Sequence, residues 1–155
     1  KTYKPDLNIS FLWKGMNGDS ETLNQIRNDL KKAKLEDVVR LIPSDNDMDS
    51  FYQKIDVFLL ASREDPYPLV VLEAASYGKP IICFDNAGGA PEFVQDDAGT
   101  VVEYVDIIGL ANALDTYQKN PDLVKQKGNR AKEKVQKKHQ DKNLVLAQLN
   151  QILND

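Results

Sequence analysis

The stretch SREDPYPLVVLEAASYGKP, residues 62–80, decides how this sequence folds, because it contains both the start and the end of one helix. Pro68 suits the first turn of a helix, where a backbone N–H has no partner to lose. Gly78 suits the left-handed position that ends a helix, and Pro80 prevents its continuation. The sequence therefore predicts a helix over residues 68–77.

Apolar, β-rich runs lie on both sides of this helix and recur along the chain. The predicted strands are residues 8–13, 38–42, 56–61, 80–84 and 99–104. The predicted helices are residues 19–34, with Asp19 or Ser20 as N-cap, then 47–54, 68–77, 90–95, 106–120 and 121 to about 153. Strands that alternate with helices indicate a parallel sheet, and continuous apolar runs indicate strands covered on both faces. We expect an α/β fold: a Rossmann-like parallel sheet with helices on both faces and a C-terminal helical tail. The tail is expected to pack across the sheet or to reach another domain.

Size, charge and composition exclude several classes of protein. The chain has 155 residues, which is one domain, and its net charge of −4 argues against a nucleic-acid partner. The Lys-rich run 125–142 indicates a solvated helix face, with a role at a membrane surface left open. No apolar run approaches the ~20 residues that span a bilayer. The lone Cys83 indicates a reducing compartment, and with one histidine, His139, the chain alone cannot build a zinc site or a Cys–His pair.

The start of the predicted helix 68–77 has the features of an anion site. The helix follows the carboxyl end of a strand, which is where ligands bind in open α/β sheets. Its first N–H groups, those of Leu69, Val70 and Val71, have no carbonyl partner within a helix, and the helix dipole adds positive potential. A phosphate group is the expected ligand at this position.

Two carboxylates, Asp65 and Glu73, stand with seven residues between them on either side of this helix start. Acids beside a phosphate make sense if they accept hydrogen bonds from sugar hydroxyls, as a carboxylate does with a ribose in Rossmann folds. One acid on each side of a diphosphate fits a nucleoside diphosphate sugar. The apolar neighbours of Glu73 predict that it is partly buried. The alternative is that Asp65 caps the helix and Glu73 forms an exposed helix salt bridge.

A second acidic segment, Asp45-Asn46-Asp47, resembles part of a metal-binding loop. A calcium loop would need Gly at Ser50 and Glu at Asp56, and this sequence has neither. The segment is better explained as the capping loop of helix 47–54, and we predict no metal site.

The segment DVFLLASREDPYPLVVLEAASYGKPIICFDNAGGAPEFVQDDAGTVV, residues 56–102, resembles the C-terminal, donor-binding domain of GT-B-fold retaining glycosyltransferases of family 4 (glycosyl transferases group 1). Residues 7–15 and 35–60 resemble the strands and helix that precede the motif in that domain. The family's motif has two glutamates with seven residues between them. Asp65 and Glu73 match these positions, and Glu64 is a second candidate for the first acid.

The resemblance implies a role for each matching residue. Asp65 would be the catalytic residue and would contact the transferred sugar near the reacting carbon. Glu73 would bind the nucleotide ribose. The backbone amides of Leu69 and Val70 would meet the diphosphate. The first acid is Asp instead of Glu, and Pro66 and Pro68 replace the usual glycines around Tyr67. The remaining substrate-binding residues implied are Pro66, Tyr67 and Pro68. Pro43 and Ser44 would line the base pocket, and Gly88 and Gly89 are possible loop contacts.

The Gly88-Gly89 loop either touches the donor or only packs. If the resemblance holds, residues 1–155 are one nucleotide-sugar-binding domain that lacks its first strand–helix unit and the N-terminal acceptor domain. The implied reaction moves a hexose-type sugar from a UDP or GDP sugar to an acceptor hydroxyl with retention, without cofactor or metal. The acceptor would be a saccharide, a lipid-linked molecule or a small molecule, in a pathway such as polysaccharide biosynthesis.

The implied location is cytoplasmic, with peripheral contact at the inner membrane face left open. Two other functions remain alternatives. One is a GT-B relative of the epimerase or phosphorylase type, and the other is a non-catalytic flavodoxin-like binding module. We expect the isolated chain to be inactive as a transferase.

Overall fold

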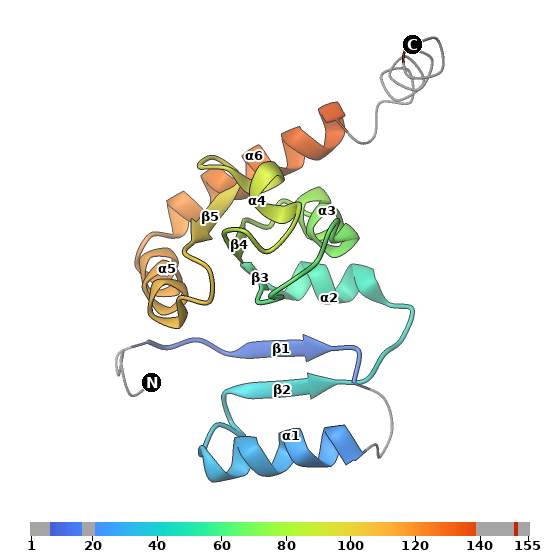
Figure 1. Ribbon diagram of the computed structural model, residues 1–155, viewed down its shortest axis with the longest axis vertical. Coiled ribbons are helices and arrows are strands. Elements are labelled where there is room, and N and C mark those ends of the chain that lie inside the picture. Colours follow the sequence, from blue (N-terminus) through green and yellow to red (C-terminus); the bar gives the residue numbers. More distant parts are fainter. Residues whose placement is uncertain (1–6, 17–20, 139–150, 152–155) are drawn as a thin grey trace. The chain divides into compact units, whose positions relative to one another are not determined.

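The computed structural model describes residues 7–16, 21–138 and 151 (Figure 1). Strands and helices alternate in the predicted order. They are β1 Phe11–Lys14, α1 Glu21–Lys32, β2 Val39–Ile42, α2 Met48–Lys54, β3 Phe58–Leu60, α3 Leu69–Ser76, β4 Ile81–Phe84, α4 Ala90–Val94, β5 Gly99–Val102, α5 Ile107–Lys119 and α6 Pro121–Lys138. Each matches a predicted element within a few residues. The predicted cap at Asp19 or Ser20, His139 and the end of the helical tail lie outside the described residues.

All strand pairs are parallel, which confirms the predicted α/β class. β1 pairs with β2, so that Phe11 lies opposite Val39. The other three strands form a sheet in the order β3-β4-β5, in which Leu60 lies opposite Cys83 and Cys83 opposite Val101. The chain divides into two compact units, Lys1–Phe51 and Tyr52–Asp155, and each is described by itself.

In the first unit, Lys14 at the end of β1 fixes the loop that leads into α2. The side chain of Lys14 is only 7% exposed, and its Nζ bonds to the carboxylate of Asp45 and, at 2.6 Å, to the carbonyl of Asp47. The hydrogen bond from Lys14, followed by one from the backbone of Asp47, lowers the pKa of Asp45. Asp47 caps α2, because its Oδ1 accepts from the N–H of Ser50 at 3.0 Å. The capping interpretation of this acidic loop is thus confirmed.

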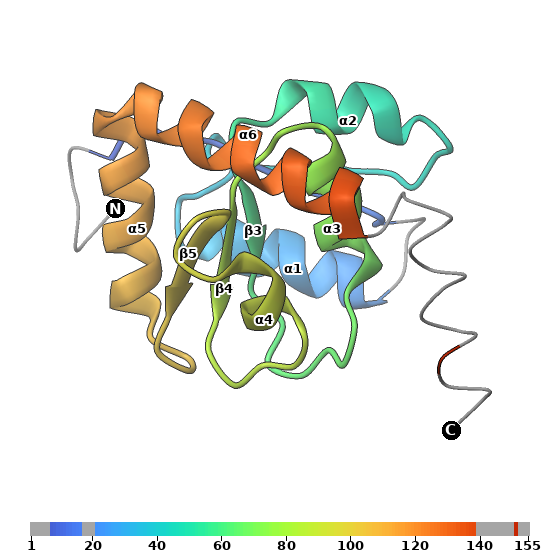
Figure 2. The same cartoon turned by 90° about the horizontal axis from the view of Figure 1, so that it is seen from above.

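In the second unit, the β3-β4-β5 sheet has an apolar cluster on each face. Figure 2 shows α3 on one side of this sheet and α5 on the other. The cluster on the α3 side contains Leu60, Val71, Ala75, Ile81, Cys83, Ala90, Val94, Ala98, Ala131 and Val135. The cluster on the α5 side contains Ile82, Phe84, Ala87, Leu110, Ala113 and Tyr117. All four residues of β4 are buried, as expected for a strand covered on both faces, whereas β3 is buried fully only at Leu60.

Helix α3 ends as its sequence predicts. Gly78 has φ +70, its N–H donates to the carbonyl of Ala75 at 2.9 Å, and the N–H of Lys79 donates to that of Ala74 at 3.1 Å. These two bonds form a Schellman motif, which satisfies the last carbonyls of the helix. The turn aims the chain from α3 directly into β4.

The C-terminal helix α6 packs against α3 and completes the core on that side. Its buried stripe consists of Gly128, Ala131 and Val135, at helical spacing, while the lysines at 125, 132 and 137 are exposed. This arrangement confirms that the tail packs against the sheet layer. The prediction of a solvated Lys-rich face holds for these three lysines, whereas Lys127 bonds to the carbonyl of Gly99 and Lys134, whose side chain is 10% exposed, pairs with Asp97. Residues 139–142 of the run lie outside the described residues. Within the described residues, no helix is both long enough and apolar enough to cross a bilayer.

Candidate functional site

The N-terminus of α3 is uncapped by any side chain. Its N-cap is Pro68, with φ −71° and ψ 98°, and no side-chain oxygen accepts from the first turn. The amides of Leu69 and Val70 lie where an α-helix provides no carbonyl to accept from them. The third expected amide is not free, because the N–H of Val71 donates to the carbonyl of Pro68 at 3.0 Å. The helix start that the sequence predicts as an anion site therefore offers two amides instead of three.

The loop that carries Asp65 is joined to the glycine loop after β4 by backbone hydrogen bonds. The N–H of Asp65 donates to the carbonyl of Ala87 at 2.8 Å, and Asp65 and Gly88 form an isolated parallel bridge. The N–H of Gly89 donates to the carbonyls of Asp65 and Pro66 at 3.3 and 3.1 Å. These bonds fix the backbone of Asp65 at the carboxyl edge of the sheet, beside the start of α3.

Gly88 and Gly89 are both required for this close approach. Gly88 has φ +119, and a Cβ there would lie 1.8 Å from the carbonyl oxygen of Asp65. A Cβ on Gly89 would lie 2.7 Å from the carbonyl oxygen of Pro66 and 3.5 Å from the ring of Tyr67. The glycines thus pack against residues 65–67, and whether they also touch a donor stays a prediction.

Glu73 lies on the second turn of α3 and is exposed, so the prediction that it is partly buried is wrong. Helix α3 turns Val71, Ala74 and Ala75 toward the core, which leaves Glu73 on the outer face. Its Oε2 accepts a hydrogen bond of 2.8 Å from the hydroxyl of Tyr52 in α2. The alternative of a capping Asp65 is wrong, since no side chain caps α3. The Tyr52 bond also sets Glu73 apart from a simple solvated helix glutamate.

The other predicted residues have different surroundings. Tyr67 is 57% exposed, Pro66 is exposed and Pro68 is buried. Glu64 is exposed, whereas its neighbour Asp65 is half-buried. Between the two candidates for the first acid, the backbone bridge to the glycine loop involves Asp65.

Two further predictions lie outside this cluster. Pro43 and Ser44 follow β2 in the first unit, so their assignment to a base pocket stays a prediction. Among the described residues, no group of three or more His, Cys, Asp or Glu side chains gathers in a way that could hold a metal ion.

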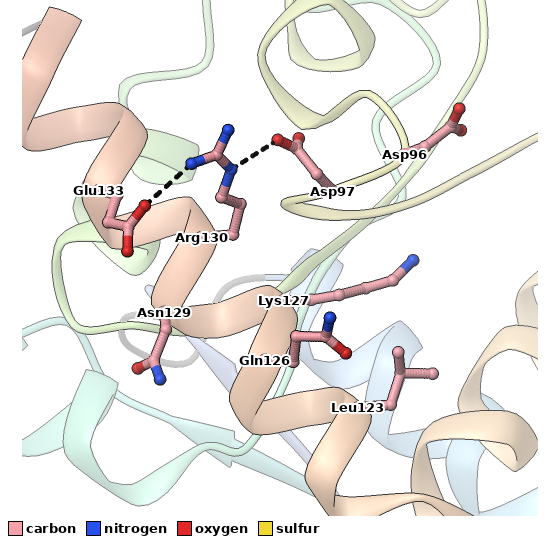
Figure 3. Close-up of a pocket in the computed structure, with 8 residues that line it drawn as sticks. All are labelled: Asp96, Asp97, Leu123, Gln126, Lys127, Asn129, Arg130 and Glu133. Carbon is pink, nitrogen blue, oxygen red and sulfur yellow. Dashed lines mark hydrogen bonds and ion pairs between the residues drawn. The ribbon is translucent and has the colours of Figure 1, made fainter.

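A cavity of about 560 Å³ lies elsewhere in the second unit, between α6 and the turn before β5 (Figure 3). Arg130 occupies its wall and bonds to Asp97 and to Glu133, each at 2.9 Å. Lys127 donates to the carbonyl of Gly99 at 2.5 Å. These charged groups bond to one another and to the backbone. They therefore form a structural joint between α6 and the turn before β5. Neither Asp65 nor Glu73 lines it.

Tyr52 is the residue that the sequence reasoning missed. A buried tyrosine needs a partner for its hydroxyl, but the burial of Tyr52, which is 2% exposed, is known only from the structure. The partner itself could not be found from sequence, since Tyr52 and Glu73 lie 21 residues apart in different helices.

Comparison with known proteins identifies the class to which this fold and site belong. Residues 6–134 match the family Glycosyl transferases group 1. An uncharacterised glycosyltransferase of Haemophilus influenzae is 30% identical over 129 residues, which cover 83% of this chain and 35% of that protein. The chain spans about a third of the length of this relative.

Solved structures share the fold. A crystal structure of a mutant of S. aureus TarM, in complex with fondaparinux, α-GlcNAc-glycerol and UDP, superposes with a TM-score of 0.80 at 20% identity. That match covers 95% of this chain and 29% of TarM. The C-terminal domain of a group 1 glycosyl transferase, LpcC of Francisella tularensis, has a TM-score of 0.67 at 25% identity, covering 78% of this chain and 64% of that one.

The chain belongs to the family of glycosyl transferases group 1, and its fold is that of the C-terminal domain of GT-B glycosyltransferases.

Proposed function

We propose that this chain is the donor-binding half of a retaining glycosyltransferase, which moves a hexose-type sugar from a nucleoside diphosphate sugar to an acceptor hydroxyl. The observation that carries the proposal is the uncapped start of α3 between two acids. Asp65 is fixed in the loop before the helix, and Glu73 follows one turn into it. A helix terminus of this kind attracts a diphosphate, and carboxylates accept from sugar hydroxyls.

In this proposal each group has a separate task. The amides of Leu69 and Val70 donate to the diphosphate and stabilise the negative charge that grows on it as the sugar departs. Glu73 accepts from the ribose hydroxyls. Asp65 accepts from a hydroxyl of the transferred sugar beside the reacting carbon and favours the positive charge that develops there. Tyr67, exposed beside Asp65, forms the wall of the sugar pocket.

The donor class has support from the relatives. A mutant of TarM, which shares this fold, has been crystallised in complex with UDP and α-GlcNAc-glycerol. Pro66 and Pro68 have no N–H to offer, so polar contacts to the sugar from this loop come from the amide of Tyr67 and from side chains.

We propose further that the acceptor domain and one strand–helix unit of the donor domain belong to other parts of the full-length protein. Among the described residues β1 pairs only with β2, and β3 only with β4. The proposal is supported by length, since the chain covers 35% of its relative from Haemophilus influenzae. We place the enzyme in the cytoplasm, where nucleotide sugars are available to it. Its acceptor is expected to be an intermediate of polysaccharide or glycoconjugate synthesis.

The test is a thermal-shift series on the full-length protein with UDP, GDP, FMN and acetyl phosphate. Stabilisation confined to a nucleoside diphosphate is expected, because binding to the folded state raises the melting temperature. The site is then checked with Glu73→Ala, which should weaken nucleotide binding about tenfold, as loss of hydrogen bonds to a charged group does. Glu92→Ala, an exposed helical glutamate of α4, is the matched control. Stabilisation by FMN or acetyl phosphate alone would contradict the proposal.

A further inference from the structure

Tyr52 provides a fixed hydrogen-bond donor to an exposed carboxylate. The side chain is 2% exposed, and its hydroxyl lies 2.8 Å from Oε2 of Glu73. Most exposed glutamates on a helix move among several rotamers, and ordering one costs conformational entropy at the moment of binding. A carboxylate that is already held by a buried donor avoids that cost.

The ring of Tyr52 is itself locked in place. It stacks on Tyr77 with 5.3 Å between the ring centroids, and it meets Phe58 at a tilt with 6.3 Å between centroids. Tyr77 is the C-cap of α3, and Phe58 belongs to β3. The position of the hydroxyl is therefore set by ring contacts with α3 and β3, and the carboxylate of Glu73 takes its orientation from it.

The bond leaves most of the carboxylate available. A carboxylate has about four lone-pair sites on two oxygens, and one hydroxyl occupies one of them. Burial, followed by the hydrogen bond and the charge of Glu73, raises the pKa of Tyr52 well above its usual range. The phenol thus stays a donor at any assay pH, and Oε1 of Glu73 remains available to accept from a ligand.

We infer that Tyr52 is a positioning residue for nucleotide recognition: its hydroxyl holds Glu73 ready to accept from the 2′ and 3′ hydroxyls of the donor ribose. This inference rests on the proposed function, because it assigns Glu73 to the ribose. It adds a residue from α2 to the set of site residues predicted from the sequence. Tyr52 acts only through Glu73.

The experiment measures dissociation constants in the full-length protein for two probes. One is UDP or GDP, whichever stabilises the protein, and the other is its 2′,3′-dideoxy form, which lacks both ribose hydroxyls. Tyr52→Phe keeps the ring and removes the hydroxyl. Its matched control is Tyr117→Phe, since Tyr117 is 3% exposed and its hydroxyl also makes a 2.8 Å bond, to Thr100 on the other face of the sheet.

Tyr52→Phe is expected to weaken binding of the normal nucleotide about three- to tenfold, the range for one hydrogen bond to a charged group. It should leave binding of the dideoxy nucleotide unchanged, and it should have no further effect when Glu73 is already alanine. Tyr117→Phe should change neither constant. Circular dichroism melting curves confirm that each variant is folded, and if Tyr52→Phe is not, Glu73→Gln probes the same bond from its exposed end.

The possible failures are distinct. If Glu73→Ala binds the normal nucleotide as tightly as the wild type, the proposed function of this site is wrong, and the inference falls with it. If Glu73→Ala weakens binding but Tyr52→Phe does not, the inference alone is wrong. If Tyr52→Phe weakens both probes equally, Tyr52 has a structural role only, which also overturns the inference.

Discussion

At the scale of single residues, Gly88 is the position where the candidate site leaves no space for a side chain. Its backbone passes so close to Asp65 that a Cβ would meet the carbonyl carbon at 2.5 Å as well as the oxygen. The sequence pattern Gly-Gly-Ala-Pro predicts a glycine loop that permits close backbone approach before a short helix, but the segment that approaches it could not be predicted. Steric requirements of this kind depend on a segment more than 20 residues away.

Gly88→Ala tests that requirement, with Gly15→Ala as its control. Both glycines have similar positive φ angles, +119 and +109, but a Cβ on Gly15 would have nothing within 4 Å. Gly15→Ala is expected to lower the free energy of unfolding by about 1 kcal/mol through backbone strain alone. Gly88→Ala adds a steric clash and should lower it by about 3 kcal/mol and weaken UDP binding. Urea unfolding and calorimetric titration measure the two effects; equal losses in both variants would contradict the packing argument.

Val105 is a non-glycine residue at a position whose backbone conformation favours glycine. It has φ +60 in the turn after β5, a region that a β-branched residue rarely adopts, and it is 37% exposed. Val105→Asn should raise the free energy of unfolding by about 0.5–1 kcal/mol, because asparagine tolerates the left-handed region. The melting temperature would rise by about 2 °C. Ile108→Asn, three residues on in α5 and 50% exposed, should instead lower it slightly, and a rise in both variants would point to lost apolar exposure as the cause.

At the scale of elements, each helix boundary that a strong local signal defines was predicted correctly. Pro68 and Gly78 fix the ends of α3, and Asn120-Pro121 fixes the break between α5 and α6. The buried face of α6 was not predicted, because Gly128, Ala131 and Val135 are too small to form a visible apolar stripe among lysines. The packing role of small residues can be recognised only when the element that they contact is known.

Gly128→Ala tests this helix contact through the sign of its effect. In an exposed helix, Gly→Ala stabilises by about 1 kcal/mol. Here a Cβ on Gly128 would lie 2.0 Å from the carbonyl oxygen of Gly78 and 3.3 Å from the ring of Pro80. We expect a loss of about 2–3 kcal/mol, since α6 must move away from the end of α3. The neighbouring Asn129→Ala, on the exposed face, should be neutral or slightly stabilising in the same thermal unfolding assay.

The joint between α6 and the turn before β5 should make stability depend on pH. Burial by itself would raise the pKa of Asp97, but hydrogen bonds from Lys134 and Arg130 together lower it. A carboxyl whose pKa is lower in the folded state stabilises the fold fully above its unfolded value of about 3.9 and loses that effect as the pH falls through its folded value. Asp97→Asn should therefore lower the melting temperature at pH 7, with a difference from wild type that shrinks below about pH 4. Asp96→Asn, at the exposed neighbour, should show no such trend, and a constant difference for Asp97→Asn would refute the ion-pair explanation.

At the scale of the whole molecule, the parallel α/β class was predictable because it needs only the alternation of strands and helices. The reach of Tyr52 to Glu73 was not, because contacts between helices depend on how each is rotated about its axis. Family membership narrows the chemistry, and the chain spans about a third of the length of its relative from H. influenzae.

The isolated chain is expected to bind UDP or GDP weakly and to transfer no sugar. The reason is that the groups which hold the acceptor, and part of those which grip the diphosphate, belong in our proposal to other segments of the protein. Release of nucleoside diphosphate from a panel of nucleotide sugars measures turnover, with the full-length protein as the positive control. Sustained turnover by residues 1–155 alone would refute this division of labour.

The backbone bridge between Asp65 and Gly88 also limits how this chain can be re-engineered or can diverge. Replacing residues 62–68 with those of a relative therefore requires replacing residues 85–89 as well. The reason is that the two segments are joined by backbone hydrogen bonds and pack closely against each other. Chimeras that exchange one of the two alone should misfold locally, and natural lineages should inherit the two segments as a matched set.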